Sequence, residues 1–177
     1  AIVAASSGDT LLIEGGRTFT ENLTLPISLT IQGGYDGCAS GSTERTTIDG
    51  SASNPVVTIQ AGLSVTLTQL NLTNGSTGLD GGGIRFARGS GTGTLNLTNV
   101  HIYGNTAQWG GGLWAGLDAE VTGENVHIYD NNATDYGGGV RLYGGRATFE
   151  NSNIYNNTAP RGGGVDGTRE DGFAPVL

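Results

Sequence analysis

Short stretches in which apolar and polar residues alternate recur along the chain at a nearly constant interval. The clearest copies place Ile102, Ile128 and Ile154 at the same point, so the interval is 26 residues twice. A looser copy places Leu72 there, 30 residues before Ile102. A second alternating stretch precedes each of these, as at residues 95–97 (LNL). Alternation with a period of two predicts β-strands.

Three consecutive glycines and one apolar residue follow each copy and begin a third short strand. The four runs occupy residues 81–84, 110–113, 137–140 and 162–165. Strands this short are unstable alone, but the same strand of the next repeat can pair with them about 4.8 Å away. The chain is therefore expected to be all-β and to wind as a single-stranded parallel β-helix (solenoid), with one repeat per coil.

Identical positions of successive repeats should stack in columns along such a solenoid. The isoleucine column faces inward, and so does the column of Leu67, Leu97 and Phe149, in which Gly123 leaves a gap. Two asparagine columns are expected to be scaffold, because asparagine tolerates the left-handed conformation of a sharp corner and stacked amides hydrogen-bond to one another. They are Asn99, Asn125 and Asn151 at a corner, and Asn105, Asn131 and Asn157 where the third strand ends.

The composition supports this fold and excludes other classes. Glycine supplies 33 of 177 residues but has no three-residue period, so the chain is not collagen-like, and the abundant Gly, Thr and Asn disfavour a helical bundle. A net charge of -8 makes nucleic acid a poor partner. No run of 18 apolar residues is present, so no membrane span is expected. The single Cys38 cannot form an internal disulfide and is expected to be buried as a small apolar residue.

The absence of lysine, together with abundant Thr, Asn and Gly, is typical of an exported protein. A secreted, extracellular or cell-surface location is therefore expected. The chain begins without Met and ends without an obvious terminating element, which is typical of a piece of a longer chain.

The chain resembles the pectin-lyase-like right-handed β-helix superfamily over residues 8–166. In the N-terminal half the resemblance rests on residues 8–16 (GDTLLIEGG), 20–25 (TENLTL), 28–35 (SLTIQGGY) and 47–50 (TIDG). The later repeats look like those of bacterial surface proteins and autotransporter passengers, although Tyr stands where those have Phe, and a third Gly where those have Ala. The resemblance implies one right-handed domain over residues 1–177, with about six or seven coils in residues 8–166. Residues 1–7 would be the remnant of a cap and residues 167–177 a C-terminal tail.

Two outward columns of the expected solenoid carry aromatic and arginine side chains. One column directly precedes the triple glycines (Asp80, Trp109, Tyr136 and Arg161), and the other lies just after them (Arg85, Trp114, Arg141 and Asp166). Aromatic rings stack on the CH groups of sugars, and arginine binds carboxylates with two donors. The resemblance also implies that substrate lies along this face. The candidate glycan-binding residues are Arg85, Trp109, Trp114, Tyr136, Arg141, Tyr143 and Arg161. The alternative is that these side chains only shield a glycine-rich strand.

No catalytic residue, metal site or cofactor is expected. Glycosidases need two carboxylates roughly 5–9.5 Å apart, whereas Asp80 and Asp166 are expected three coils apart, about 14 Å. The column of His101 and His127 offers too few ligands for a structural zinc site and is expected to be a surface pair. A parallel column of Tyr103, Tyr129 and Tyr155 is expected to form a stacked ladder.

The expected function is that of a secreted or cell-surface module, adhesin-like or structural, which binds a polysaccharide or cell-surface glycan along the aromatic and arginine face. One alternative is a polysaccharide lyase or glycoside hydrolase. Another is a structural subunit that self-associates through the open ends of the β-helix into a filament. Against this last alternative, the apolar tail residues Phe173, Val176 and Leu177 are expected to cover the last coil.

Overall fold

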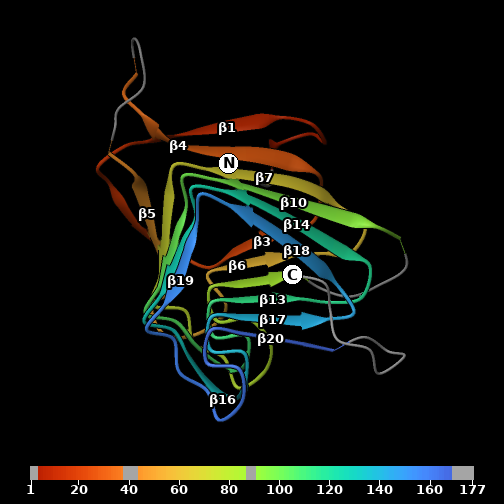
Figure 1. Cartoon of the computed structure of the whole chain (residues 1–177). Helices are drawn as coiled ribbons and strands as arrows, with labels where there is room; N and C mark the ends of the chain where they lie inside the picture. Colours follow the sequence, from red (N-terminus) through yellow and green to blue (C-terminus); the bar gives the residue numbers. More distant parts are fainter. Residues whose placement is uncertain (1–3, 38–43, 87–90, 169–177) are drawn as a thin grey trace.

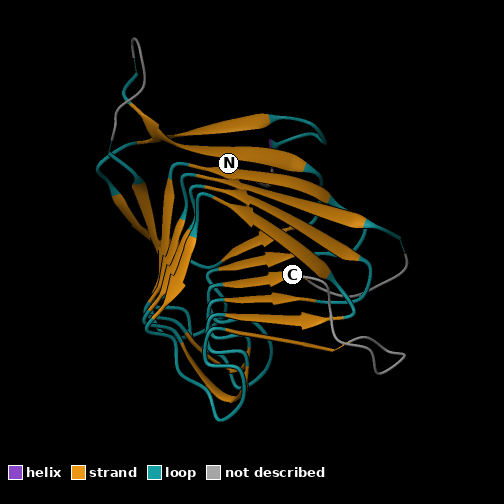
Figure 2. Ribbon diagram, viewed as in Figure 1, coloured by secondary structure: helices purple, strands orange, loops and turns teal. Residues whose placement is uncertain are grey.

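Three parallel sheets of six strands form the walls of the protein, which a computed structural model describes for residues 4–37, 44–86 and 91–168. Figure 1 shows the three walls around a common interior, with the chain passing from one wall to the next in each coil. No α-helix occurs in the described residues, as the strand and loop colouring of Figure 2 shows. The all-β parallel solenoid expected from the repeats is thereby confirmed.

The strand bounds follow the sheets. The first sheet contains β1 (Thr10–Glu14), β4 (Leu29–Tyr35), β7 (Ser64–Thr68), β10 (Gly93–Thr98), β14 (Ala119–Glu124) and β18 (Arg146–Glu150). The second contains β2 (Thr18–Thr20), β5 (Thr46–Asp49), β8 (Leu70–Thr73), β11 (His101–Tyr103), β15 (His127–Tyr129) and β19 (Asn153–Tyr155). The third contains β3 (Leu23–Leu25), β6 (Val57–Ile59), β9 (Ile84–Phe86), β13 (Leu113–Ala115), β17 (Val140–Tyr143) and β20 (Val165–Thr168). A fourth, two-stranded sheet pairs β12 (Thr106–Trp109) with β16 (Asn132–Tyr136).

The number of coils is slightly smaller than the sequence suggested. The described chain makes about 5 turns, against the expected six or seven. The first strand begins at Thr10 and the last ends at Thr168, so the expected coil boundaries of residues 8–166 are close to the observed ones. The repeats in the N-terminal half are longer than 26 residues, because loops such as residues 36–45 and 50–56 lie between the strands. Fewer coils therefore fit into the same length of chain.

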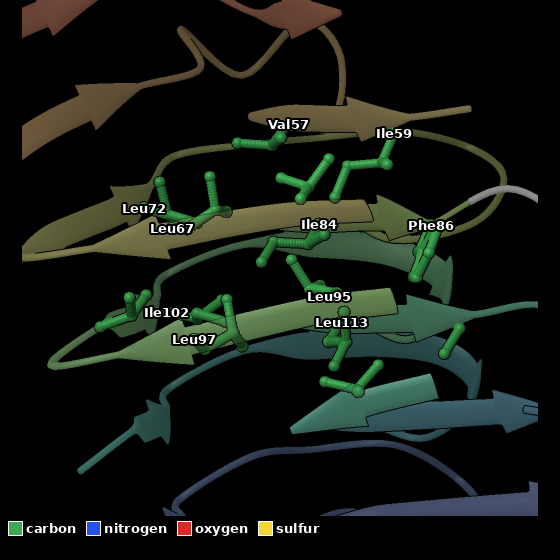
Figure 3. Close-up of a cluster of buried hydrophobic side chains, with 14 of the residues drawn as sticks. Val57, Ile59, Leu67, Leu72, Ile84, Phe86, Leu95, Leu97, Ile102 and Leu113 are labelled. Atoms are coloured by element: carbon green, nitrogen blue, oxygen red, sulfur yellow. The ribbon is translucent and has the colours of Figure 1, made fainter. Parts of the chain in front are cut away.

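The interior of the solenoid is a continuous apolar core. The column of Leu72, Ile102 and Ile128 is fully buried, and Ile154 packs against it from the last coil. Figure 3 shows the labelled side chains of all three walls pointing into the same interior. Full burial of one such side chain contributes about 1.5–3 kcal/mol to stability.

The gap expected at Gly123 is occupied by an aromatic ring. Gly123 pairs with Phe149 of the next coil, and a Cβ at Gly123 would overlap the Phe149 ring. The same device appears in the neighbouring coils, where a Cβ at Gly93 would lie 2.6 Å from Phe86 Cζ. A glycine in one column thus makes room for a phenylalanine in the interior, and the core stays filled.

Amide side chains set the corners of the coils as expected. Gln69, Asn99, Asn125 and Asn151 all have a positive φ, between 48° and 56°. Within this column Asn125 Nδ2 donates to Asn99 Oδ1 at 2.6 Å. The left-handed backbone turns the chain from the first sheet into the second at the same point of four successive coils.

The second asparagine column is a buried ladder. Asn105 and Asn131 are each only 1% exposed. Asn105 Nδ2 donates to Asn131 Oδ1, and Asn131 Nδ2 donates to Asn157 Oδ1, both at 2.9 Å. The backbone N–H of each also donates to the amide oxygen of the next coil, and Asn131 Nδ2 reaches the carbonyl of Ile102 at 2.9 Å. Each amide therefore satisfies groups on two neighbouring coils.

Several expectations concern residues that lie outside the described ones. They are the burial of Cys38, the cap formed by Phe173, Val176 and Leu177, and most of the tail over residues 167–177. The described part of the chain contains no helix that is long and apolar enough to cross a membrane.

Replacing Asn131 by Ala tests the amide ladder. The change leaves the Asn105 amide and the Ile102 carbonyl without their partner in the core. An unsatisfied buried polar group costs about 1–3 kcal/mol, so we expect the free energy of unfolding to fall by at least about 3 kcal/mol. Chemical denaturation measures this. The neighbouring Asn132→Ala, at an exposed position, should change it by about 0.5 kcal/mol or less; equal losses would contradict the ladder.

A double-mutant cycle tests the filled gap. Gly123→Ala should destabilise the protein by about 1–3 kcal/mol, because the added methyl group overlaps the Phe149 ring. In a Phe149→Leu background the same change should cost at least about 1 kcal/mol less. Thermal and chemical unfolding of the four proteins measure the coupling. Additive losses would mean that the ring does not occupy this space.

Candidate ligand-binding groove

The triple glycines fold the chain so that the two outward columns face each other. The first glycine of each run has a positive φ, from 62° to 65° at residues 81, 110, 137 and 162. The second lies against the next coil: a Cβ at Gly82 would be 2.6 Å from the Gly111 carbonyl oxygen, and one at Gly111 would be 2.5 Å from that of Gly138. Only glycine permits this tight turn with the coils so close. The residues before and after each run therefore line one concave angle.

One wall of this angle belongs to the small two-stranded sheet. Trp109 at the end of β12 pairs with Tyr136 at the end of β16, and isolated bridges extend the column to Asp80 and Arg161. β16 has one residue more than β12, and the pairing shifts between Ala107 and Trp109. This bulge brings the two aromatic residues into register although the repeats differ in length by one residue.

The other wall is the outward column of the third sheet. Arg85, Trp114, Arg141 and Asp166 pair in this order on β9, β13, β17 and β20, as the sequence predicted. Trp114 and Arg141 are nevertheless only 5% and 6% exposed. They form the floor of a groove, whereas Trp109, Tyr136 and Tyr143 are half-buried around it.

The groove has a volume of about 320 Å³ and is lined by Asp80, Trp109, Trp114, Tyr136, Arg141 and Tyr143. Five of the seven candidate residues from the sequence line it, and Arg85 and Arg161 lie beside it in the two columns. Asp80 was not among the candidates, although its place in the column before the triple glycine was visible in the repeat.

Aromatic rings and guanidinium groups stack within the groove. The Trp114 and Tyr143 rings lie 6.5 Å apart with an interplanar angle of 17°. The guanidinium carbons of Arg161 and Arg141 lie 4.2 Å and 5.1 Å from the centre of the Tyr136 ring. Cation–π contacts of this kind strengthen when they are desolvated.

Asp166 joins two of these arginines at one end of the groove. It forms ion pairs with Arg141 and, at 3.2 Å, with Arg161. Arg141 also donates to Thr168 Oγ1 at 3.1 Å. Burial lowers the pKa of Arg141, and the charge of Arg161 lowers it further, while Tyr136 and Tyr143 raise it. The charge of Arg141 is thus shared among groups of the protein itself.

At the opposite end Arg85 faces Asp80, with 3.7 Å between Arg85 Nε and Asp80 Oδ2. This is an ion pair without a hydrogen bond, and Arg85 Nε is buried. Three guanidinium groups and two carboxylates therefore flank the groove, a local excess of one positive charge in a chain of net charge -8.

The groove lacks a pair of close carboxylates. Asp80 and Asp166 belong to columns that are three coils apart in register, as predicted. A different pair occurs on the first sheet, where Glu124 and Glu150 are direct neighbours on β14 and β18 beside a shallow hollow of about 340 Å³. Sequence reasoning missed this pair because it searched only the face next to the triple glycines.

Comparison with protein-family models, with curated proteins and with solved structures finds no match to this chain. The resemblance to the pectin-lyase-like superfamily therefore stays a prediction, and the parallel β-solenoid itself is what the structure shows.

Changing Asp166 to Asn tests the buried ion pair. The change keeps the shape but leaves the guanidinium of Arg141, 7% exposed as a side chain, without its counter-charge. Breaking such a pair typically costs about 3–5 kcal/mol, and we expect a loss of unfolding free energy of about 3 kcal/mol. The control is Glu14→Gln, which breaks the exposed pair with Arg17 and should cost about 1 kcal/mol or less. A small effect at Asp166 would show that the pair is solvated.

Proposed function

We propose that the protein is a secreted or cell-surface module that binds a glycan in the groove between the third sheet and the two-stranded sheet. The observation that carries the proposal is the clustering of two tryptophans, two tyrosines and arginines in one concave surface. Sites for small ligands are typically concave, mostly apolar and aromatic, with a few polar groups that fix orientation. Four aromatic side chains and Arg141 fit that description.

The division between floor and rim indicates which residues touch the ligand. Trp114 and Arg141 are almost fully buried, and Arg161 covers one side of the Tyr136 ring. Trp109 is half-buried at the rim and follows Asp80 in its column. The indole of Trp109 is therefore the surface on which a sugar ring stacks, and Asp80 and Arg85 supply polar groups for its hydroxyls and substituents. The buried pair Arg141–Asp166 positions the aromatic rings.

The groove follows the axis of the solenoid, because each of its two walls is a column of residues from successive coils. Successive contacts thus repeat about every 4.8 Å. A polymer or oligomer of similar units can meet the same kind of side chain in each coil. We therefore expect oligosaccharides to bind more tightly than single sugars.

Trp109→Ala is the test of this proposal. On an array of neutral and acidic oligosaccharides, we expect the wild-type chain to bind a defined group of glycans and the variant to lose at least about tenfold in affinity, as for a truncated aromatic hot spot. Tyr103→Ala removes an aromatic residue from the second sheet instead and should leave binding unchanged. Retained binding by Trp109→Ala, or no binding by the wild type, would refute the proposal.

The alternative of a polysaccharide-degrading enzyme predicts a different outcome. Incubation with the glycans that bind would then release shorter products, which chromatography detects. Stacked carboxylates one coil apart are near the separation of about 5–5.5 Å that retaining glycosidases use, so Glu150→Gln, which changes the pair with Glu124, would be the first variant to assay. Products that are absent in the wild type leave binding as the activity.

A further inference from the structure

Both histidines of the chain lie side by side on the outer face of the second sheet. His101 on β11 pairs directly with His127 on β15. Their ring centres are 4.7 Å apart, and the planes meet at 65°. The edges of two imidazoles from adjacent coils thus meet at one point of the surface, on a different wall from the groove.

Asparagines continue this column on both sides of the histidines. Asn71 precedes His101 and Asn153 follows His127. The Asn153 amide lies 3.5 Å from His127 Nδ1. The oxygen and nitrogen of such an amide exchange places by a rotation of the side chain, and the donor roles of a neutral imidazole depend on its tautomer. The column can therefore turn two imidazole nitrogens and one amide oxygen toward a common point.

His101 is in the form that a metal ligand requires. Its pKa is lowered to about 4, first by burial and then by the charges of Arg45 and His127. At neutral pH the imidazole is uncharged and keeps a free lone pair, so no proton has to leave before an ion binds.

We propose that His101 and His127 together bind one divalent transition-metal ion, with Asn153 Oδ1 and water completing its coordination. Imidazole nitrogen is a preferred ligand of Cu²⁺, Ni²⁺ and Zn²⁺, and Cu²⁺ binds most tightly in this series. Metal–nitrogen bonds of about 2.0–2.1 Å bring two ligating nitrogens to about 3 Å, which small rotations of two touching rings achieve. The site is open and exchangeable, in contrast to a closed structural zinc site.

Arg45 limits the affinity of this site. Its Nε donates to the Asn99 carbonyl at 3.0 Å, and its charge lowers the pKa of His101. The same charge repels a metal cation. Removing it, as in Arg45→Gln, should therefore tighten metal binding, whereas a purely structural role of the histidines gives no reason for such a gain.

The repeat itself supplies the matched variants. Asparagine occupies this column in β8 and β19, so His101→Asn and His127→Asn place in the column a residue that it already carries elsewhere. Calorimetric titration of the whole chain with Cu²⁺, Ni²⁺ and Zn²⁺ should show one site. Loss of a supporting group alone typically costs 10–100-fold in metal affinity, so each histidine variant should bind Cu²⁺ at least about tenfold more weakly. Arg45→Gln should bind it more tightly.

Imidazole NMR signals give an independent readout, because the chain has only 2 histidines. On addition of Zn²⁺, both rings should shift together with the same midpoint. Cu²⁺ affinity that is unchanged in both histidine variants, or a Zn²⁺ shift in only one ring, would overturn the proposal. Several weak sites without a histidine-dependent one would also overturn it and indicate an adventitious ion only. Trp109→Ala should leave the titration unchanged.

Discussion

The structure depends on the hydrogen bonds that buried amides make between one coil and the next. Asn105, Asn131 and Asn157 lie in the same column, and each amide oxygen accepts from both the backbone and the side chain of the preceding one. A coil shifted by one residue would leave these polar groups buried without partners, at a cost of several kcal/mol. The apolar columns alone allow more tolerance, because Leu, Ile and Val can replace one another in the core. The amide ladder therefore fixes the register of the last coils.

This register determines where the functional side chains lie. The ladder ends each strand of the second sheet, and the chain then runs to the triple glycine, which sits against the backbone of the next coil. Because successive runs stack directly, Trp109 lies beside Tyr136 and Trp114 beside Arg141. The groove is thus a consequence of the same stacking that fills the core. A scaffold of this kind can change its outward residues one at a time without disturbing the inward columns.

Period-two alternation and exact repetition made most of the scaffold predictable. The three strands per coil, the isoleucine column, both asparagine columns and the stacked Tyr103–Tyr129–Tyr155 ladder follow from the alignment of repeats and are confirmed. The repeats also placed both outward columns in the correct register. Each of these features depends only on which residues share a position in the repeat.

Features that depend on how segments of one coil bend toward each other could not be predicted in this way. Trp114 and Arg141 looked exposed because they alternate with inward residues, but the segment that carries β12 and β16 folds over them. That segment becomes a sheet through a bulge, and the repeat alignment shows the bulge only as one extra residue. The interior likewise depends on pairs from different columns, such as Gly123 with Phe149, in which the size of one residue compensates for the other.

The two candidate sites differ in how much the scaffold prepares them. The floor of the groove is rigid, because Arg141 is held by Asp166, Thr168 and Tyr136 before any ligand arrives. A ligand there loses little free energy in ordering the protein, which favours selective binding. The histidine column stands on a flat wall and must turn its side chains to meet an ion. The first site therefore selects by shape, whereas the second selects by the chemistry of its donors, and the same stacking of coils serves both because they lie on different walls.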